Sequence, residues 1–477
     1  MQRRAVTGSA LRSAASRDSA RRPGTRGRSR CAGALWLAVL VAASTALAAP
    51  SSPPLRGAIL MIGDGMGTSA LSLGRLVKGR RLALEAMPVV GLVDPAPVGA
   101  AVTDSAAAAT ALATGRRTRN RLVGLDPAGQ RLESHLERLA ARGGAVGVVT
   151  TARLTHATPA AFYGHVAHRR QERELAAQLL ASELQLALGG GAELLEQALA
   201  QPEAARDWQL VRTAHELERV ERGRVLGLFG PSHLRYAIDR RPGDREPSLA
   251  AMVRAALRLL ARDPARPFFL VAEGGRIDHA GHSHDAAALA REVLAFDEAV
   301  ATALGFAQHD GRTLLVVTAD HATAGLAVAE DVDLVRLRRA RSSAERLLER
   351  LEQPGGQDKA AAVQRLGLLV HQELGIALSP RELAWALGTR WRYAPAGGLA
   401  HQVSARLGVH FYPLGVQARH EQTEGHQASM VPIFAWGPGA ERFSGVLPID
   451  EVGRRLGALL LEAAPPAPGD RSEGRRP

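Results

Sequence analysis

The sequence predicts an α/β protein with a large, mostly parallel central sheet flanked by helices. Short apolar runs, typical of buried strands, alternate along the 477 residues with longer segments that have helical periodicity. Parallel strands need a crossover between them, and a helix usually supplies it, so this alternation favours a parallel sheet. The apolar fraction of 46% is that of a globular chain with a sizeable core, although aromatic residues make up only 4%.

Five apolar runs predict the strands. The first ends at Gly63-Asp64-Gly65, which is typical of a strand that opens into a loop. In order along the chain, the predicted strands are 58–62, 145–150, 268–272, 313–318 and 431–435.

The segments between these runs predict the helices. The first is rich in alanine and follows Thr103-Asp104-Ser105, whose polar side chains suit a helix start. Another begins at Pro247, a residue tolerated in the first turn, and a third is expected to end at the glycines 189–191. In order, the predicted helices are 106–113, 132–142, 172–188, 247–262, 286–304 and 449–461.

The pattern changes between residues 330 and 408. Charged helical segments at 333–351 and 361–374 follow each other there without a predicted strand between them. We therefore expect a helical insertion, 330–408, within a larger α/β domain made of 55–329 and 409–462. The tail, 463–477, is rich in Pro, Gly and Arg, which predicts disorder.

Residues 1–48 predict a targeting segment. An Arg-rich stretch precedes an apolar run at 32–47, and Ala46-Leu47-Ala48 resembles a cleavage site. The run is short for a membrane span, so we expect export to the periplasm or medium after cleavage, with a retained anchor as the alternative. This segment holds nine Arg and one Asp, which is +8 of the formal charge of +13. The remaining charges are scattered, so the sequence does not favour nucleic-acid binding.

The only cysteine, Cys31, lies inside this targeting segment. The cleaved chain would then have no disulfide and no thiolate ligand. Any metal must be held by His, Asp and Glu, a ligand set that favours hydrolytic chemistry.

Acidic residues and histidines follow four of the predicted strands. In open α/β sheets, sites form beyond the carboxyl ends of the strands, so these side chains are expected to meet. Asp278 and His282 are four residues apart and would share one face of a helical turn, whereas His279 and His284 would lie off that face. The residues concerned are Asp64; His156 and Thr158; Glu273, Asp278 and His282; and Asp320 and His321.

Ser105 stands at the start of a predicted helix, and two interpretations are open. A Ser or Asp here can simply cap the helix. Alternatively, Ser105 is a nucleophile whose phosphorylated form lies at the positive end of the helix dipole. No lipase-type serine motif surrounds Ser105. The glycine-rich segment Gly63-Asp64-Gly65-Met66-Gly67 matches neither a P-loop nor a dinucleotide-binding loop.

Six segments in this order resemble the alkaline phosphatase family. They lie between residues 58 and 440 and have the sequences IGDGMG, TDSAA, TTARLTHATPAAFYGHVAHR, FFLVAEGGRIDHAGH, TADH and TEGH. The resemblance implies an alkaline phosphatase-like fold and hydrolysis of phosphate monoesters through a phosphoserine at Ser105. It also implies two Zn²⁺ ions, one Mg²⁺ ion and inorganic phosphate as product, and dimers are frequent in the family.

The resemblance also implies individual roles. Arg169 matches the arginine that holds the phosphate. The first zinc would be bound by Asp278, His282 and His426, the second by Asp64, Asp320 and His321, and the magnesium by Asp64, Thr158 and Glu273. His156 would lie beside the magnesium, where some relatives have an acid. Gln427-Ala428 departs from the Thr-Gly that often follows His426, and His420 is a rival ligand whose flanking residues do not match.

Two other functions remain open at this point. Phosphodiesterases and sulfatases use related metal sites, although Arg169 and the Thr158–Glu273 pair favour a monoester. A non-catalytic exported protein that binds metal or phosphate would need the ligands but not Ser105.

Overall fold

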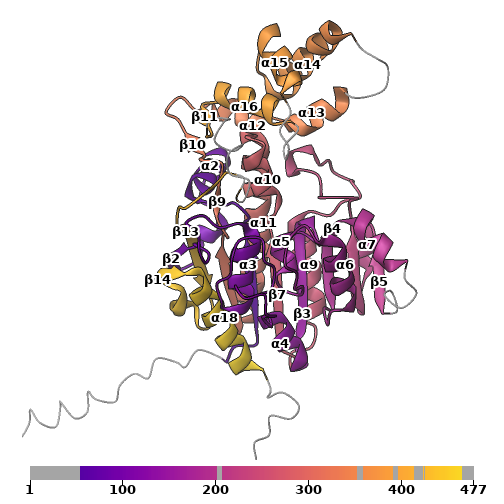
Figure 1. Cartoon of the computed structure of the whole chain (residues 1–477), viewed down its shortest axis with the longest axis vertical. Coiled ribbons are helices and arrows are strands. Elements are labelled where there is room, and N and C mark those ends of the chain that lie inside the picture. The colour runs from indigo at the N-terminus through magenta and orange to yellow at the C-terminus, as the bar shows by residue number, and fades with distance from the viewer. Residues whose placement is uncertain are drawn as a thin grey trace, which may run out of the picture. The chain divides into compact units, whose positions relative to one another are not determined.

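The computed structural model describes residues 54–200, 207–351, 358–389, 396–412, 423 and 425–464. All of them belong to one compact unit, Pro53–Pro477 (Figure 1). The predicted targeting segment and the C-terminal tail from residue 465 lie outside the described residues.

A ten-stranded sheet forms the centre of this unit. Every strand runs in the same direction except β13, which is antiparallel to both of its neighbours. In sheet order the strands are β14 (Gly445–Pro448), β2 (Val89–Asp94), β13 (Val431–Trp436), β8 (Thr313–Thr318), β1 (Gly57–Ile62), β7 (Phe268–Glu273), β3 (Ala145–Arg153), β4 (Leu186–Gly190), β6 (Arg224–Leu228) and β5 (Trp208–Val211).

Helices cover both faces of the sheet. On one face α9 (Leu249–Leu260) and α11 (Ala286–Asp310) pack together, and α2 (Thr68–Lys78) packs against α11. On the other face α18 (Ile449–Ala463) packs against α3 (Ser105–Thr114) and α4 (His135–Ala141). Strands β1, β7 and β8 are buried along their whole length, which explains why their sequences are continuous apolar runs. The predicted fold class is confirmed.

The remaining elements are shorter. They include α5 (Ala157–Ala160), α6 (Glu172–Ala181), α7 (Ala192–Leu199), α8 (Ala214–Arg219) and α10 (Arg276–His282), with 3₁₀ turns η1 (Ala83–Ala86), η2 (Ala237–Asp239) and η3 (Ala440–Phe443). Between residues 334 and 406 lie α12 (Leu334–Arg339), α13 (Ala344–Leu351), α14 (Lys359–Leu374), α15 (Pro380–Gly388) and α16 (Gly397–Arg406). A two-stranded sheet of β10 (Ala327–Val328) and β11 (Val409–His410) joins the two ends of this helical segment.

Two predicted helices are wrong. The segment 172–188 is helical only to Ala181, and its last residues begin strand β4. A short apolar run that is buried on both faces carries no period, so the sequence pattern could not separate it from the preceding helix. Of the glycines that were expected to end the helix, Gly189 and Gly190 lie in this strand and Gly191 follows it. A Cβ at Gly190 would come within 2.0 Å of the Ser232 carbonyl oxygen.

The predicted helix 333–351 is interrupted between Arg339 and Ala344. Ser343 there donates two hydrogen bonds to the buried carboxylate of Asp239, from its backbone N–H and its hydroxyl. These bonds to a distant residue replace the local bonds of a helix.

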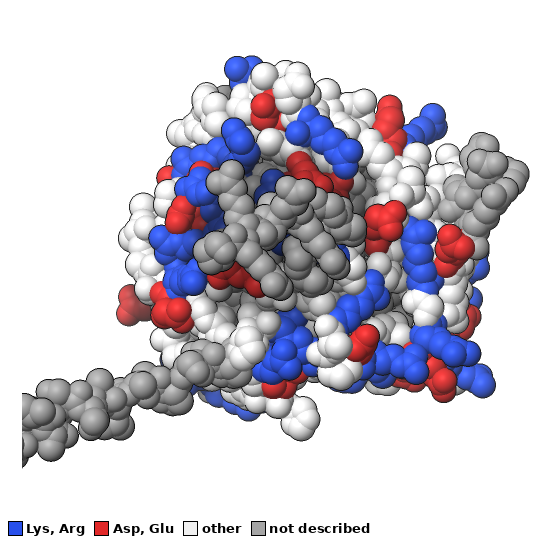
Figure 2. Space-filling view, turned by 90° about the horizontal axis from the view of Figure 1, so that it is seen from below, with Lys and Arg blue, Asp and Glu red and all other residues white. Residues whose placement is uncertain are grey.

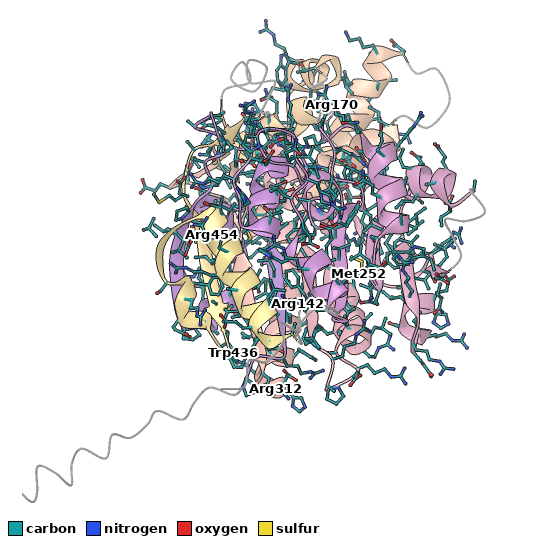
Figure 3. All side chains as sticks on the ribbon, turned by 60° about the horizontal axis from the view of Figure 1, so that its bottom comes forward. Arg142, Arg170, Met252, Arg312, Trp436 and Arg454 are labelled. Atoms are coloured by element: carbon teal, nitrogen blue, oxygen red, sulfur yellow. The ribbon has the colours of Figure 1, made fainter. Side chains whose placement is uncertain are left out.

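The parallel strands all point their carboxyl ends toward one side of the molecule. Arg142 and Arg312, which precede β3 and β8, lie at the lower end in Figure 3, with Trp436 at the end of the antiparallel β13. Arg170 lies at the opposite end. Predicted site residues that follow strands therefore gather at the side of Arg170.

Charged side chains are mixed on the surface. On the face shown in Figure 2, Lys and Arg side chains are interspersed with Asp and Glu among the described residues. A search of the described helices finds none that is long and apolar enough to cross a membrane.

Candidate metal centre

The predicted ligands lie beyond four strands that are neighbours in the sheet. The sheet order β8–β1–β7–β3 brings together the loops that follow these strands. Asp64 comes two residues after β1, Glu273 ends β7, and Asp320 follows β8. The three carboxylates are fully buried. The sequence argument from strand ends therefore placed them in one location.

Asp64, Asp320 and His321 form one group of side chains at this location. Nε2 of His321 lies 3.4 Å from Oδ1 of Asp64 and 3.3 Å from Oδ2 of Asp320. The other ring nitrogen, Nδ1, lies 3.2 Å from the Thr323 hydroxyl, which in turn donates to Asp278. The hydroxyl of Ser105 lies 3.1 Å from Nε2 of His321. Nε2 thus faces two carboxylates and the predicted nucleophile.

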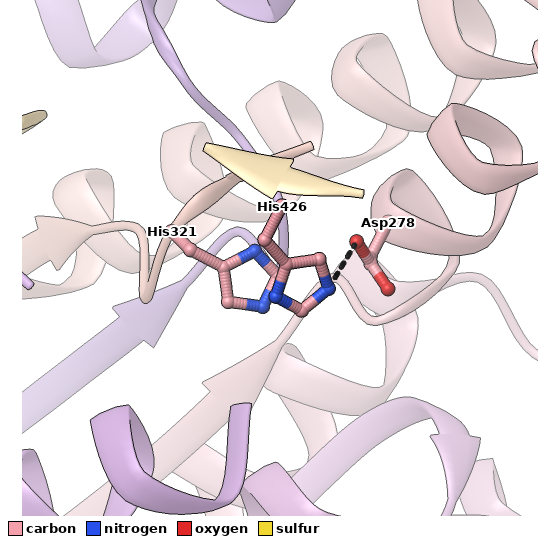
Figure 4. Close-up of side chains that lie close together, drawn as sticks. All are labelled: Asp278, His321 and His426. Atoms are coloured by element: carbon pink, nitrogen blue, oxygen red, sulfur yellow. Dashed lines mark ion pairs between the residues drawn. The ribbon is translucent and has the colours of Figure 1, made fainter. Parts of the chain in front are cut away.

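Asp278, His321 and His426 form a second group (Figure 4). The rings of His321 and His426 stack with their centroids 3.6 Å apart. Nε2 of His426 lies 3.9 Å from Oδ1 of Asp278 and 3.1 Å from Nε2 of His282. As predicted from their spacing, Asp278 and His282 share one face of α10, with 3.2 Å between Oδ2 and Nε2.

A short strand pair carries His426 to this location. Strand β12 (His426–Gln427) pairs with β9 (Ala322–Thr323), which directly follows His321. Nδ1 of His426 donates a hydrogen bond of 2.9 Å to the carbonyl oxygen of Thr103. That bond fixes the tautomer and leaves the Nε2 lone pair directed at Asp278 and His282.

Asp64, His156 and Glu273 form a third group. Each can offer one ligand atom, and these atoms lie within 4.8 Å of one another. The Thr158 hydroxyl donates to Oδ2 of Asp64 over 3.4 Å, and the Thr150 hydroxyl donates to Oε2 of Glu273. His156 was expected beside this group, and the structure places it at ligand distance.

Buried carboxylate oxygens that lack a hydrogen-bond partner test whether this centre fits cations. Among the described residues, Oδ1 of Asp64, Oδ2 of Asp320 and Oε1 of Glu273 are buried and make no hydrogen bond. Burial raises the pKa of Glu273 to about 7 and, with repulsion from Asp278, that of Asp320 to about 7. Burial and repulsion from Asp320 also raise the pKa of Asp64 well above its usual value. Oxygen-rich anionic groups of this kind fit divalent cations.

Arg169 borders the centre and is half-buried, with 24% of its side chain exposed. Its Nη1 donates to Oδ2 of Asp104 over 3.3 Å, and its Nη2 donates to Nε2 of His156 over 3.1 Å. Asp104 also caps α3, because its Oδ1 accepts from the backbone N–H of Ala107. The sequence suggested Asp104 only as a helix cap, and its second contact, 65 residues away in the chain, had no local signal.

Comparison with known proteins identifies the family. A family model described as alkaline phosphatase matches residues 55–349, more than half of the chain. The chain belongs to the alkaline phosphatase family. Alkaline phosphatase 4 of Bacillus subtilis is 28% identical over 82% of this chain and 86% of its own length. Streptomycin-6-phosphate phosphatase of Streptomyces griseus is 36% identical over 63% of this chain and 81% of its own length.

Comparison with solved structures supports the same family assignment. The alkaline phosphatase of Thermus thermophilus matches with a TM-score of 0.74 at 30% identity, covering 88% of this chain and 94% of that chain. The cold-active alkaline phosphatase of Shewanella sp. also has a TM-score of 0.74, at 28% identity and over 85% and 99% of the two chains. The family resemblance noted in the sequence is confirmed. As an alkaline phosphatase the chain hydrolyses phosphate monoesters, and metal ions belong to this activity.

The stretch after His426 departs from the usual sequence of alkaline phosphatases, and the structure gives Gln427 a role. Its side-chain oxygen accepts a hydrogen bond of 3.2 Å from the backbone N–H of Gly325, which supports the β9–β12 pair. His420, the rival ligand, lies outside the described residues. His284 is buried but lies apart from the three groups, 3.0 Å from His401 between their Nδ1 atoms and stacked on Phe411.

Proposed function

We propose that the chain hydrolyses phosphate monoesters through a phosphoserine formed at Ser105. The observation that carries this proposal is the position of the Ser105 hydroxyl, 3.1 Å from Nε2 of His321 and at the first position of α3. The fold family supplies the reaction class, and this contact supports a particular nucleophile.

Three cations would complete the centre. Asp278, His282 and His426 offer one carboxylate and two imidazoles, a set that suits Zn²⁺. Asp64, Asp320 and His321 offer two carboxylates and one imidazole next to Ser105, a second set that suits Zn²⁺. Asp64, Glu273 and Thr158 offer the oxygen atoms that Mg²⁺ prefers, with His156 close by. When bound, these ions would lower the pKa of the serine hydroxyl and of a water molecule and neutralise charge on the phosphoryl oxygens.

The chain's own groups then have defined tasks. The Ser105 oxygen attacks phosphorus, and the ester oxygen departs on the opposite side. A phosphoryl group attached to Ser105 would lie at the N-terminus of α3, where the helix dipole favours negative charge. Arg169 presents a planar pair of N–H donors that fits two phosphoryl oxygens. Water then hydrolyses the phosphoserine and releases inorganic phosphate.

Metal analysis of the purified protein, combined with turnover of an aryl phosphate before and after chelation, tests this proposal. We expect about three bound ions per chain, loss of turnover on chelation and recovery when zinc and magnesium are restored. An aryl methyl phosphodiester and an aryl sulfate serve as comparison substrates. Faster turnover of either one would overturn the monoester assignment.

We also propose that the chain is exported, with residues 1–48 removed, and that it forms a homodimer. The Arg-rich and apolar pattern of these residues supports export. The homodimer is proposed because alkaline phosphatases are often dimers. N-terminal sequencing of secreted protein and its mass in solution test the two proposals.

A further inference from the structure

A series of side-chain contacts joins the helical segment to Arg169. It starts at Glu345 in α13 and passes through Arg276, His279 and His156. We propose that Glu345 and Arg276 are positioning residues for the phosphate-binding arginine, so that the helical segment sets the affinity of the centre for phosphate. This inference rests on the proposed role of Arg169.

Arg276 is a buried cation whose guanidinium donates hydrogen bonds to the carboxylate of Glu345. Its side chain is 7% exposed, and Nη2 lies 3.1 Å and 3.2 Å from the two carboxylate oxygens of Glu345. The guanidinium also lies over the ring of Tyr236, with 3.6 Å between Cζ and the ring centroid. A buried charge that loses its partner is costly, so the guanidinium position depends on Glu345. The buried carboxylate of Glu292 also stabilises the Arg276 charge, but Glu345 is the carboxylate that accepts its hydrogen bonds.

Glu345 itself is held firmly to the α/β domain. The residue before it, Ala344, donates its backbone N–H to Oδ2 of Asp285 over 2.8 Å, and Ser343 is bound to Asp239. Asp285 and Asp239 are both buried. Two buried carboxylates therefore fix the first turn of α13, and Glu345 reaches Arg276 from a rigid base.

The contacts continue from Arg276 toward the phosphate site. Nη1 of Arg276 donates to Nδ1 of His279 over 3.3 Å, which fixes the tautomer and ring orientation of His279. The His279 ring packs edge-on against His156, at 5.4 Å between centroids and an interplanar angle of 82°. The His233 ring packs against both, at 4.2 Å and 5.8 Å. His156, confined in this way, accepts the hydrogen bond from Nη2 of Arg169.

Removal of the Glu345 charge should weaken the contacts that follow it in this series, as far as the hydrogen bond between His156 and Arg169. Arg276 would shift, the His279 and His156 rings would gain freedom, and Arg169 would lose a fixed partner. Neither Glu345 nor Arg276 is the attacking group or a proposed metal ligand, so the rate of the bound complex should change little. Phosphate affinity and KM should change more than kcat.

The variant Glu345→Gln keeps the size of the side chain and removes its charge. The matched control is Glu349→Gln, in the same helix, where the carboxylate pairs with Arg346 on the surface. For the holoenzyme we expect Glu345→Gln to raise the inhibition constant of inorganic phosphate and KM by about three- to tenfold, within the usual range of coupling through such contacts. We expect kcat, metal content and melting temperature to stay close to those of the control.

A double variant separates positioning from a general structural effect. In an Arg169→Ala background, Glu345→Gln should no longer change the phosphate inhibition constant. An equal change in both backgrounds, or no change in either, would overturn the inference. If Arg169→Ala alone leaves phosphate inhibition unchanged, the proposed function of Arg169 fails instead, so the two failures are distinguishable. Glu345→Asp, which keeps the charge, should recover part of the affinity.

Discussion

The Ser105 hydroxyl and the His321 imidazole lie 3.1 Å apart, between Oγ and Nε2. Their sequence separation is 216 residues, and both are buried. By itself Ser105 could have been a helix cap, but Asp104 performs that task. The hydroxyl is therefore available for chemistry, and it faces the same ring nitrogen that approaches Asp64 and Asp320.

Replacement of Ser105 by alanine should remove turnover and keep the metals. Asp64, Asp320 and His321 would still hold the second zinc without the Ser105 oxygen, so zinc content should persist. Loss of a covalent nucleophile, in contrast, usually costs at least about a thousandfold in kcat. Aryl-phosphate turnover and metal content, measured on the same preparation, check this. A Ser105→Ala protein with wild-type kcat would rule out the phosphoserine, and Ser72→Ala, on the exposed side of α2, serves as control.

The residues of the metal centre show how much of the site could be predicted from the sequence. Asp64, Asp320 and His321 could be placed together because the carboxyl ends of parallel strands meet at one edge of the sheet. His426 could be placed only by family resemblance, because a two-residue strand pair brings it there from a distant part of the chain. The contact of Arg169 with Asp104 carried no local pattern at all.

Some strands of the fold could likewise be predicted from the sequence, and others could not. Fully buried strands such as β1 and β8 stand out as apolar runs between polar loops, and they were found. Strand β2 was missed because its exposure alternates, with Val90 and Leu92 on the surface, and its sequence has no matching polar residues. Strand β4 was missed because a helix runs into it after a four-residue gap.

Replacement of Arg169 should weaken phosphate binding. Hydrogen bonds to charged groups contribute about 1.5–3 kcal/mol, so Arg169→Ala should raise the inhibition constant of phosphate by roughly 10- to 100-fold. Arg169→Lys keeps the charge but not the paired donors, and we expect it to recover only part of the affinity. Product-inhibition kinetics measure both variants. Equal inhibition of the alanine variant and the wild type would contradict the assigned role.

His156 should limit the magnesium preference of the third group. A neutral imidazole has one in-plane lone pair. In His156 the Nη2 donor of Arg169 would compete for this lone pair with a cation near Asp64 and Glu273. His156→Asp supplies two oxygens, so one could accept from Arg169 while the other binds a cation, and magnesium prefers oxygen. We expect the aspartate variant to retain more magnesium after dialysis, measured by metal analysis. His156→Asn, which lacks the charge, is the comparison, and equal magnesium in all three proteins would refute the argument.

His135 should make the fold sensitive to acid. It is buried between α4 and α18, and burial, with Arg138 close by, lowers its pKa from 6.5 to about 4. His135 therefore binds a proton below about pH 6.5 in the unfolded chain, but only below about pH 4 in the folded chain. Stability from this residue is complete above pH 6.5 and falls as the pH drops toward 4, by roughly 3 kcal/mol at most because one pKa unit corresponds to about 1.4 kcal/mol.

His135→Leu should remove this part of the acid sensitivity. The free energy of unfolding in urea, measured on chelated protein at pH 7.5 and pH 5, should fall less in the leucine variant than in the wild type. Chelation is needed because metal affinity also depends on pH. His309→Leu, at an exposed position of α11, should keep the wild-type difference between the two pH values. If the leucine variant at 135 loses as much stability as the wild type between these pH values, the buried neutral histidine is not a source of the acid sensitivity.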